Sequence, residues 1–229
     1  MSVRIGLVFV LAAAVVGVGG YAALRAQEKA GGSEPEVPLP PPEEKGLRSL
    51  EEVLAARRSV RAFKGAALTP KQLGQLLWSA QGVSDRARGL RTAPSAGALY
   101  PLEVYAVTVE GVFRYVPERH AIRKVRGGDV RQSLAAAALG QSWVAEAPAS
   151  VVITAVYART ARKYGERARR YVALEAGGAV ENVLLQAAAL GLGSVPVGAF
   201  DDRRVQEVLG CAAEEEPLLI VPVGEAARP

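Results

Sequence analysis

The chain has 229 residues, half of them hydrophobic, and a formal net charge of +5. Its one cysteine, Cys211, excludes an intrachain disulfide, and its one histidine, His120, without a cysteine cluster argues against a zinc site. The basic residues are spread along the chain with few aromatic residues among them, so a nucleic-acid-binding surface is not favoured.

The N-terminal region has no charged residue between Ile5 and Leu24, and Arg4 and Arg25 flank this apolar run. Twenty helical residues at about 1.5 Å each span about 30 Å, the thickness of the hydrocarbon core of a bilayer. The run therefore predicts one transmembrane helix within an N-terminal segment 1–25. A cleaved signal peptide is the alternative, although its apolar region is usually about 7–15 residues long. We expect a membrane-anchored protein whose remaining residues lie outside the cytoplasm, although the charges that flank the run do not decide its orientation.

Residues 26–46 have the composition of a linker, with prolines among glutamates and glycines. Proline at this density favours extended polyproline II structure without internal hydrogen bonds. The segment is therefore predicted to be a tether, and residues 47–229 to be the folded domain.

Helix and strand signals alternate irregularly in residues 47–229. Ser49 with Glu52 has the pattern of a capping box, and Thr69 begins a second helix that stops at Gly82. β-Branched and aromatic residues from 104 to 109 turn at 110–111 and return, which predicts an antiparallel hairpin. His120 lies in a polar turn after this hairpin, where most histidines are solvated. Further expected elements are strands at 121–125, 149–157, 195–197 and 218–223, and helices at 129–139, 159–190 and near 201. This order predicts an α+β fold, a mainly antiparallel sheet surrounded by helices.

A cluster of three arginines and a serine follows the first predicted helix: Arg57, Arg58, Ser59 and Arg61. A guanidinium group can hold a phosphate by two parallel hydrogen bonds, so the cluster indicates an anion site. Basic residues also occur at helix C-termini because they complement the helix dipole. The cluster alone leaves both interpretations open.

Four separated segments together resemble the motifs of the nitroreductase family, and they cover residues 47–229. They are Arg57-Arg58-Ser59-Val60-Arg61-Ala62-Phe63, Pro94 to Pro101, Glu175-Ala176-Gly177-Gly178 with Gly191 to Gly198, and Val221-Pro222-Val223-Gly224 with Arg228. The sequence Gly-Ala-Leu-Tyr-Pro-Leu-Glu in the second segment is similar to the SagB-type branch, the thiazoline or oxazoline dehydrogenases. Gly177-Gly178 departs from the Gly-His of that branch.

This resemblance implies FMN bound at the interface of an intertwined homodimer. It implies that the flavin phosphate and ribityl chain contact Arg57, Arg58, Ser59, Arg61 and Arg228. It further implies that a polar loop, Pro94-Ser95-Ala96-Gly97, comes from the other subunit. Backbone groups of Pro196-Val197-Gly198 would face the flavin ring, where glycine allows a close approach.

Lys163 and Tyr164 resemble a Lys-Tyr pair that takes part in proton removal in the SagB-type branch. The chemistry suits a base, because hydride transfer to flavin N5 leaves a C–H proton to be collected. The pair could equally well belong to a solvated basic helix surface. Basic residues nearby in the sequence are Arg159, Arg162, Arg167, Arg169 and Arg170.

The sequence therefore predicts an FMN-dependent oxidoreductase that transfers hydride through flavin N5 between a small-molecule donor and acceptor. The chain has no Rossmann glycine fingerprint, so NAD(P)H would bind only transiently over the flavin. The alternative is a membrane-tethered, non-catalytic flavin- or ligand-binding protein. No metal is expected.

Overall fold

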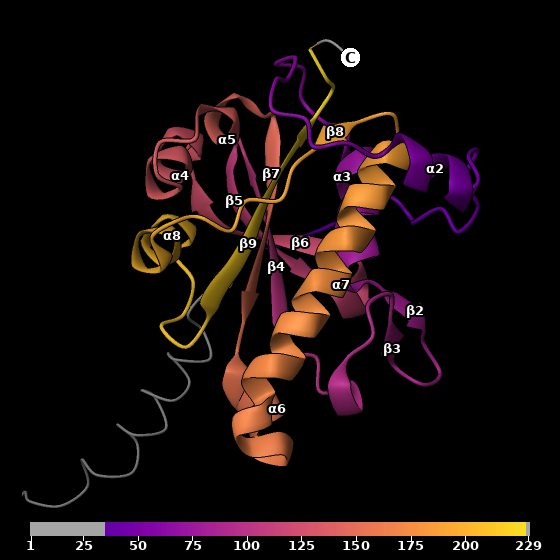
Figure 1. Cartoon of the computed structure of the whole chain (residues 1–229), viewed down its shortest axis with the longest axis vertical. Helices are drawn as coiled ribbons and strands as arrows, with labels where there is room; N and C mark the ends of the chain where they lie inside the picture. Colours follow the sequence, from indigo (N-terminus) through magenta and orange to yellow (C-terminus); the bar gives the residue numbers. More distant parts are fainter. Residues whose placement is uncertain (1–34, 228–229) are drawn as a thin grey trace, which may run out of the picture. The chain divides into compact units, whose positions relative to one another are not determined.

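A seven-stranded antiparallel sheet forms the centre of residues 35–227, the part of the chain that the computed structural model describes. The strand order is β1-β6-β5-β4-β7-β9-β8 (Figure 1). The strands are β1 (Glu36–Pro38), β4 (Leu102–Thr108), β5 (Gly111–Val116), β6 (Ala121–Gly127), β7 (Ala149–Ala155), β8 (Gly193–Ser194) and β9 (Glu216–Gly224). A separate two-stranded ribbon pairs β2 (Val83–Asp85) with β3 (Leu90–Arg91).

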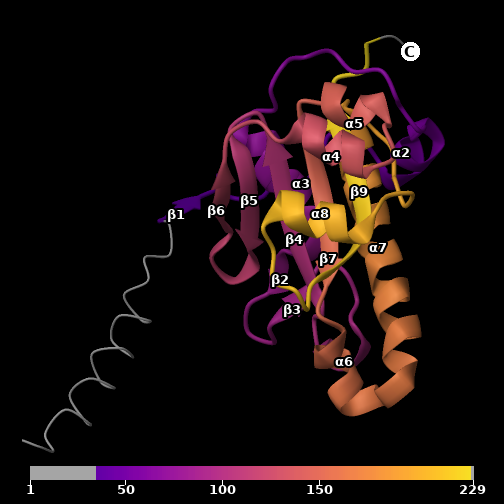
Figure 2. The same ribbon diagram turned by 90° about the vertical axis from the view of Figure 1, so that its left-hand side faces the viewer.

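Helices cover both faces of the sheet, as Figures 1 and 2 show. They are α2 (Leu50–Ala56), α3 (Pro70–Gln81), α4 (Arg131–Ala137), α5 (Ser142–Glu146), α6 (Tyr157–Tyr164), α7 (Ala168–Ala189) and α8 (Asp202–Leu209). Three short 3-10 helices are η1 (Ala96–Ala98), η2 (Pro117–Arg119) and η3 (Gly165–Arg167).

Alternate residues of the central strands pack into two separate hydrophobic cores, because successive side chains of a strand point to opposite faces of the sheet. On β4, Val104 and Ala106 pack with residues of α3 and α7. Between them, Tyr105 points to the other face and packs with residues of α4, α5 and α8. The predicted α+β fold with a mainly antiparallel sheet is confirmed.

The predicted capping box at Ser49 is present, and the helix predicted to start at Thr69 begins with a capping box as well. The Ser49 hydroxyl accepts a hydrogen bond from the Glu52 amide at 3.2 Å, and the Glu52 carboxylate accepts from the Ser49 amide at 2.7 Å. Thr69 and Gln72 make the same reciprocal pair at the start of α3. These caps satisfy amides that have no partner within the helix, which is why the helices begin at these residues.

The predicted helical region 159–190 is interrupted. Gly165 has a φ of +54°, which ends α6, and η3 then leads into α7. Glycine takes this conformation without the penalty that a Cβ atom brings. The break lets α6 and the 22-residue α7 run in different directions.

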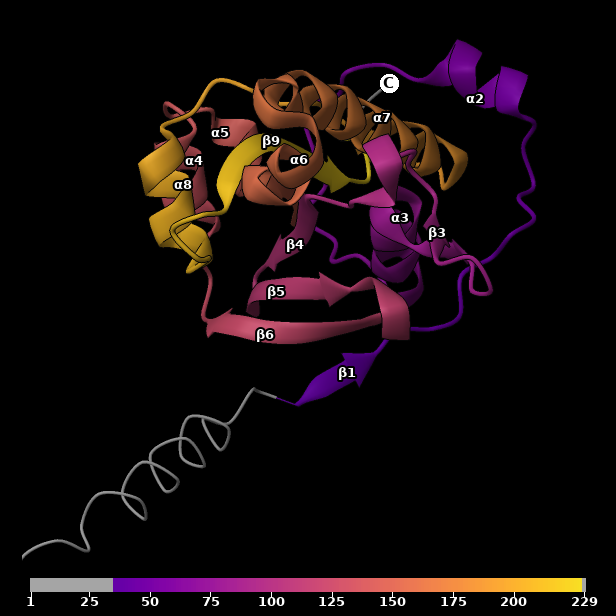
Figure 3. The ribbon, with the colours of Figure 1, turned by 90° about the horizontal axis from the view of Figure 1, so that it is seen from below.

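The second half of the predicted tether belongs to the folded unit. Residues 36–38 form β1 and pair with β6 at the edge of the sheet (Figure 3). Leu39 is buried, and its amide donates to the His120 carbonyl at 3.0 Å. Farther along, the Glu43 amide donates to the Gln75 side chain at 2.8 Å. A proline-rich composition did not prevent this docking, because a three-residue edge strand needs few amide donors.

His120 is buried, whereas the sequence predicted a solvated side chain. Its Nδ1 lies 2.8 Å from the Tyr115 hydroxyl and its Nε2 lies 2.8 Å from the Pro40 carbonyl. A carbonyl only accepts, so Nε2 carries the hydrogen and Nδ1 accepts from Tyr115. Burial lowers the pKa of His120, so the neutral ring fastens the segment after β1 to the sheet.

The prediction of a membrane-anchored protein is corrected. Within residues 35–227 no helix is long and apolar enough to cross a bilayer. The predicted membrane localisation is therefore withdrawn. The predicted span, residues 5–24, lies outside the residues that the structure describes.

We expect His120→Asn to lower the free energy of unfolding by about 1–3 kcal/mol, because Tyr115 and Pro40 lose a buried partner. Asparagine tolerates the left-handed backbone of this position, where φ is +46°. Because the folded pKa of His120 lies below the unfolded value of 6.5, wild-type stability falls as the pH drops below 6.5. The variant should lack this part of the pH dependence.

Urea unfolding of both proteins at pH 5.5 and 7.5 measures this difference. Glu110→Ala, in the exposed turn between β4 and β5, is the control and should follow the wild type. An equal loss of stability on acidification in His120→Asn and wild type would contradict the assignment.

Candidate functional site

The first motif, residues 57–63, runs in extended form between β8 and the C-terminal segment. The Val60 amide donates to the Ser194 carbonyl at 3.0 Å, and Ser59 pairs with Ser194. On the other side, the Ala227 amide donates to the Ala62 carbonyl at 2.9 Å. The motif is thus held by segments from the far end of the chain. Arg228, the predicted phosphate contact, follows directly and lies outside the described residues.

Arg57 and Arg58 line a cavity of about 360 Å³. Arg57 Nε lies 3.8 Å from Glu181 Oε1 on α7, a loose and partly exposed pair. The Arg58 guanidinium donates to two backbone carbonyls of α2 and its end, at 3.0 and 2.7 Å. The opposite wall comes from the end of α7 and from β8, including Leu184, Ala188, Gly191, Leu192, Gly193 and Ser194. The cavity therefore joins the first motif to the glycine-rich turn after α7.

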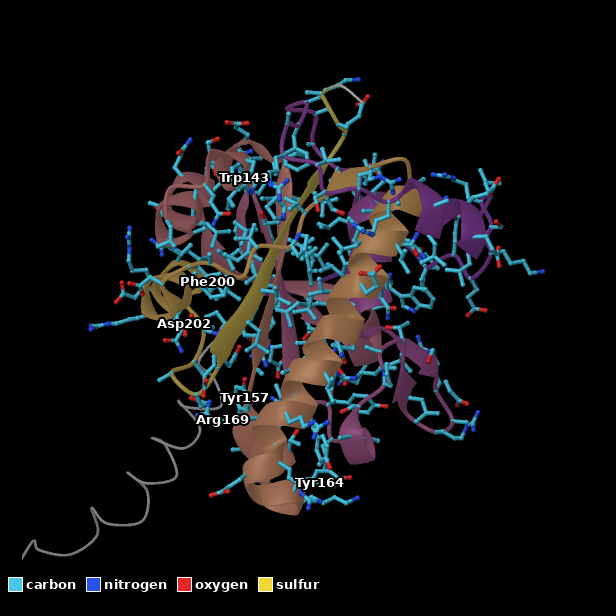
Figure 4. The ribbon with its side chains drawn as sticks, in the orientation of Figure 1. Trp143, Tyr157, Tyr164, Arg169, Phe200 and Asp202 are labelled. Carbon is cyan, nitrogen blue, oxygen red and sulfur yellow. The ribbon has the colours of Figure 1, made fainter. Side chains whose placement is uncertain are left out.

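Arg61 turns away from this cavity and lies over the ring of Trp143, 5.6 Å from the ring centre. Trp143 is on α5, and Figure 4 shows it at the end of the sheet where α5 lies. Its indole Nε1 is buried and has no hydrogen-bond partner among residues 35–227. The Arg61–Trp143 contact therefore lies outside the cavity that Arg57 and Arg58 line.

The segment Pro196-Val197-Gly198 lies beside β9. Val197 exchanges two backbone hydrogen bonds with Ile220, at 2.8 and 2.9 Å. Its amide is therefore engaged, and Pro196 has no amide hydrogen to offer. Gly198 is exposed and a Cβ atom there would meet only Leu219, at 3.8 Å. Of the three predicted residues, Gly198 is the one whose backbone lies open.

The second motif forms a strained loop, residues 94–100. Gly97, Ala98 and Tyr100 have φ values of +65°, +53° and +44°. For residues with a Cβ atom this conformation is costly and is kept only where the surroundings enforce it. Here Ser95 enforces it, because its hydroxyl accepts from the Tyr100 amide at 2.9 Å and its carbonyl accepts from the Ala98 amide at 3.0 Å.

Lys163 and Tyr164 lie against this loop. A Cβ atom at Gly97 would be 2.9 Å from the Tyr164 hydroxyl and 3.0 Å from Lys163 Nζ. The Tyr164 ring in turn packs edge-on against Tyr171 of α7, with ring centres 4.9 Å apart. The structure therefore brings the predicted Lys-Tyr pair to the predicted polar loop, a juxtaposition that glycine at position 97 permits.

The predicted residues fall into two groups, which we call the first and the second half-site. The first half-site contains Arg57, Arg58, Ser59, Arg61 and Pro196 to Gly198. The second contains Pro94 to Gly97, Lys163 and Tyr164. Gly97 lies beside α6, before α7 begins, whereas Ser59 lies beside β8, after α7 ends. In Figure 4, Trp143 and Tyr164 accordingly lie at opposite ends of the folded unit.

Glu175 is a site residue to which sequence reasoning assigned no role. It is on α7, 4% exposed, with Gln81 Nε2 3.5 Å from its carboxylate. Burial raises the pKa of Glu175 to about 7, and hydrogen bonds from Ser95 and Gln81 act in the opposite direction. The sequence held a signal, because position 175 falls on the same helical face as Val172 and Ala179, where an apolar residue is expected.

Residues 54–225 match the model of the nitroreductase family. The chain belongs to the nitroreductase family. A Methanocaldococcus jannaschii protein assigned to the nitroreductases is 47% identical over 199 residues, which cover 84% of this chain and 98% of that protein. Membership places the chain among oxidoreductases.

Solved structures agree with this assignment. A Ralstonia eutropha structure assigned to the nitroreductases has a TM-score of 0.77 and 34% identity, covering 87% of this chain and 93% of its own. The NADPH:FMN oxidoreductase of Vibrio harveyi, solved with NAD+, has a TM-score of 0.59 and 22% identity, covering 78% of this chain and 69% of its own. The latter supports the fold alone. The SagB-type branch stays a prediction.

We expect Gly97→Ala and Gly89→Ala to lose similar stability, about 1–2 kcal/mol, because both glycines have a φ of +65°. Only the first should displace Lys163 and Tyr164, since nothing lies within 4 Å of a Cβ atom at Gly89. Thermal unfolding measures the first effect, and the NMR signal of ring-labelled Tyr164 measures the second. An unmoved Tyr164 signal in Gly97→Ala would contradict the contact.

Proposed function

We propose that this chain is an FMN-dependent oxidoreductase that passes hydride between a small-molecule donor and acceptor. The observation that carries the proposal is the pair of half-sites, an arginine-lined cavity at one end of α7 and, at the other, a Lys-Tyr pair of α6 that lies against a strained loop. The relative from Vibrio harveyi is named for activity with NADPH and FMN, which supports the same chemistry.

The residues of the first half-site suit a phosphate-bearing flavin. A phosphate monoester carries close to two negative charges at neutral pH, and guanidinium groups pair with it through charge-assisted hydrogen bonds. Arg57 and Arg58 line the cavity, and the buried Trp143 N–H beside Arg61 lacks an acceptor. Arg57, Arg58, Arg61 and Arg228 would hold the phosphate, with Ser59 as a further donor. When bound, FMN supplies a reversible two-electron acceptor for hydride.

A homodimer would complete the site. The outer stripe of α7 carries Leu174, which is 65% exposed, beside the small residues Ala173, Gly177 and Gly178. These apolar and small residues lie between the exposed Arg170 and Glu181 on the same face, and an exposed leucine in such a stripe favours contact with a second copy. If two copies cross at this stripe in opposite directions, the second half-site of one protomer reaches the first half-site of its partner.

Lys163 and Tyr164 are the proposed proton-handling residues. A substrate that gives up hydride from a C–H bond must also lose a proton, and Lys163 would collect it, with the Tyr164 hydroxyl beside it. Their contact with Gly97 supports this role, because the loop of the second half-site is the part expected to face the partner's cofactor. The same contact supports the finer assignment to the SagB-type branch, from which Gly177-Gly178 departs.

The test starts from the full chain, purified and titrated with FMN. We expect a yellow protein whose flavin is bleached under anaerobic conditions by NADH, NADPH or a quinol. Arg57→Ala combined with Arg61→Ala should weaken FMN binding at least about a hundredfold, because each charged hydrogen bond contributes about 1.5–3 kcal/mol. Quenching of flavin fluorescence measures the dissociation constant.

Arg203→Ala is the matched control for charge, because Arg203 is exposed on α8 and pairs only with Glu207 among the described residues. It should bind FMN like the wild type. A wild-type chain that does not bind FMN would contradict the proposal. A bound flavin that none of the donors reduces would favour the non-catalytic binding protein.

For the dimer, we expect Leu174→Glu to dissociate the protein, because a carboxylate placed in an apolar helix interface is costly to bury. Leu139→Glu is the control, since Leu139 is similarly exposed, at 69%, at the end of α4. Sedimentation velocity separates monomer from dimer. Equal behaviour of the two variants would argue against α7 as the interface.

A further inference from the structure

The strained loop 94–100 and helix α6 leave the central sheet at the same end of two neighbouring strands. The loop leads into β4, and α6 follows β7, the antiparallel neighbour of β4. Leu102 of β4 lies opposite Ala155 of β7, and just beyond this pair the Val156 amide donates to the Pro101 carbonyl at 2.8 Å. The backbone therefore fixes where the loop ends and where the helix begins.

The side chain of Arg159 joins the loop to the helix beyond that point. It comes from the first turn of α6. Its Nη1 donates to the Tyr100 carbonyl at 3.0 Å, and its Nη2 donates to Glu103 Oε1 at 2.5 Å. One planar guanidinium group can make both bonds at once, because its donors form a rigid fork. Arg159 is therefore a bridge between the last residue of the loop, α6 and β4, and not part of a solvated basic surface.

The carboxylate that Arg159 binds is itself firmly held. The Glu103 side chain is 11% exposed, and Arg114 of β5 lies 2.8 and 3.3 Å from its two oxygens. Arg114 also lies 3.5 Å from the carboxylate of Glu215, which is buried and accepts from the Tyr105 hydroxyl at 2.6 Å. Charge-assisted hydrogen bonds of this kind add geometric specificity. A row of alternating charges thus anchors Arg159 to the interior of the sheet.

The loop is strained at the residue that Arg159 binds. Tyr100 has a φ of +44°, a conformation that is costly for a residue with a Cβ atom and that persists only where its surroundings enforce it. The Tyr100 amide donates to the Ser95 hydroxyl at 2.9 Å, and the Tyr100 carbonyl accepts from Arg159. Both backbone groups of the strained residue are therefore held by side chains, one from the loop and one from α6.

The same helix carries the proposed proton-handling residues. Arg159 and Lys163 are four residues apart, so they lie on one face of α6, a single turn from each other. A Cβ atom at Gly97 would be 3.0 Å from Lys163 Nζ and 2.9 Å from the Tyr164 hydroxyl. Helix α6 thus meets the loop at two places, with Arg159 at Tyr100 and with the Lys-Tyr pair at Gly97.

We propose that Arg159 is a positioning residue. By binding the Tyr100 carbonyl and the Glu103 carboxylate together, it fixes the strained loop relative to α6, and it thereby places Lys163 and Tyr164 against the loop. The inference deepens and rests on the proposed function, in which Lys163 collects a proton and the loop faces the cofactor of a partner.

The first test replaces Arg159 by methionine, which keeps an unbranched chain without donors. The side chain is 36% exposed, so Arg159→Met should fold. Hydrogen exchange of the Ala98 and Tyr100 amides, both bonded to Ser95, is measured in the full chain without FMN. It should become at least about tenfold faster, because hydrogen bonds to a charged group contribute at least that factor. The NMR signal of ring-labelled Tyr164 should shift as well.

Arg131→Met is the matched control, because Arg131 also binds one carboxylate and one backbone carbonyl. It donates to Asp129 at 2.7 Å and to the Ala147 carbonyl at 3.2 Å, and it lies on α4. Thermal unfolding should show a loss of stability in both variants, but only Arg159→Met should change loop exchange and the Tyr164 signal. Wild-type values for both in Arg159→Met, or the same changes in Arg131→Met, would overturn the inference.

A conservative variant separates positioning from a general loss of stability. Arg159→Lys restores the charge on a flexible stem but not the rigid fork. Its loop exchange and Tyr164 signal should therefore lie between those of the wild type and Arg159→Met. Loop exchange as fast in Arg159→Lys as in Arg159→Met would contradict the role of a charged bridge.

FMN titration of the same proteins distinguishes the failure of one proposal from the failure of the other. If the wild type binds FMN, Arg159→Met should weaken binding severalfold and Arg131→Met should not. An effect of the same size in both variants, or none in either, would count against the positioning role. If the wild type binds no FMN, the proposed function fails, whereas the exchange and NMR data still decide whether Arg159 positions the loop.

Discussion

The length of α7 constrains everything else in this molecule. Its 22 residues cover about 33 Å, at about 1.5 Å per residue, with Lys163 and Tyr164 before its first residue and the turn that lines the cavity after its last. Other residues of the two half-sites lie beside its middle, since Pro94 lies next to Gly178 and Arg57 pairs with Glu181. The arginine-lined cavity and the Lys-Tyr pair lie near different ends of this helix, and the proposed dimer would bring the two together. The small and apolar outer stripe of the same helix is the surface through which two copies would come together.

Two buried titratable groups change the stability of the fold with pH in opposite directions. Burial raises the pKa of Glu175 to about 7, so the folded chain binds more protons than the unfolded chain, and stability from this group falls as pH rises from 4.5 to about 7. Burial lowers the pKa of His120, so stability from that group falls as pH drops below 6.5. The two effects partly cancel for global unfolding. The two groups act in different places, because His120 fastens the segment after β1 whereas Glu175 lies on α7 beside Gln81.

Local chemistry made much of the fold predictable from the sequence. Ser49 and Thr69 cap their helices in the expected way, and the turn at 110–111 closes the expected hairpin. Two of the failures share one cause, which is that long-range packing decided the outcome. β1 has three residues and gains its stability from β6, and His120 is buried because the segment around Pro40 covers it. Among the site residues, the motifs were visible in the sequence, but the contacts that join Gln81 of α3 to Arg91 of β3 and to Glu175 of α7 have no sequence pattern.

The contacts of the arginines rank them for the anion they are proposed to bind. Arg58 donates to two backbone carbonyls, and hydrogen bonds to a charged group contribute about 1.5–3 kcal/mol each. Arg57 has a partly exposed pair with Glu181 at 3.8 Å, a kind of contact that contributes about 0–1 kcal/mol. The Arg61 guanidinium lies over the ring of Trp143, and an exposed cation–π contact contributes about 0.5–1 kcal/mol. Arg57 and Arg61 can therefore turn to a phosphate at little cost, whereas Arg58 would first have to give up strong bonds to the end of α2. Arg58 would then be the last of the proposed phosphate ligands to turn to the anion, and Arg61, which lies over Trp143, would have to turn toward the cavity that Arg57 and Arg58 line.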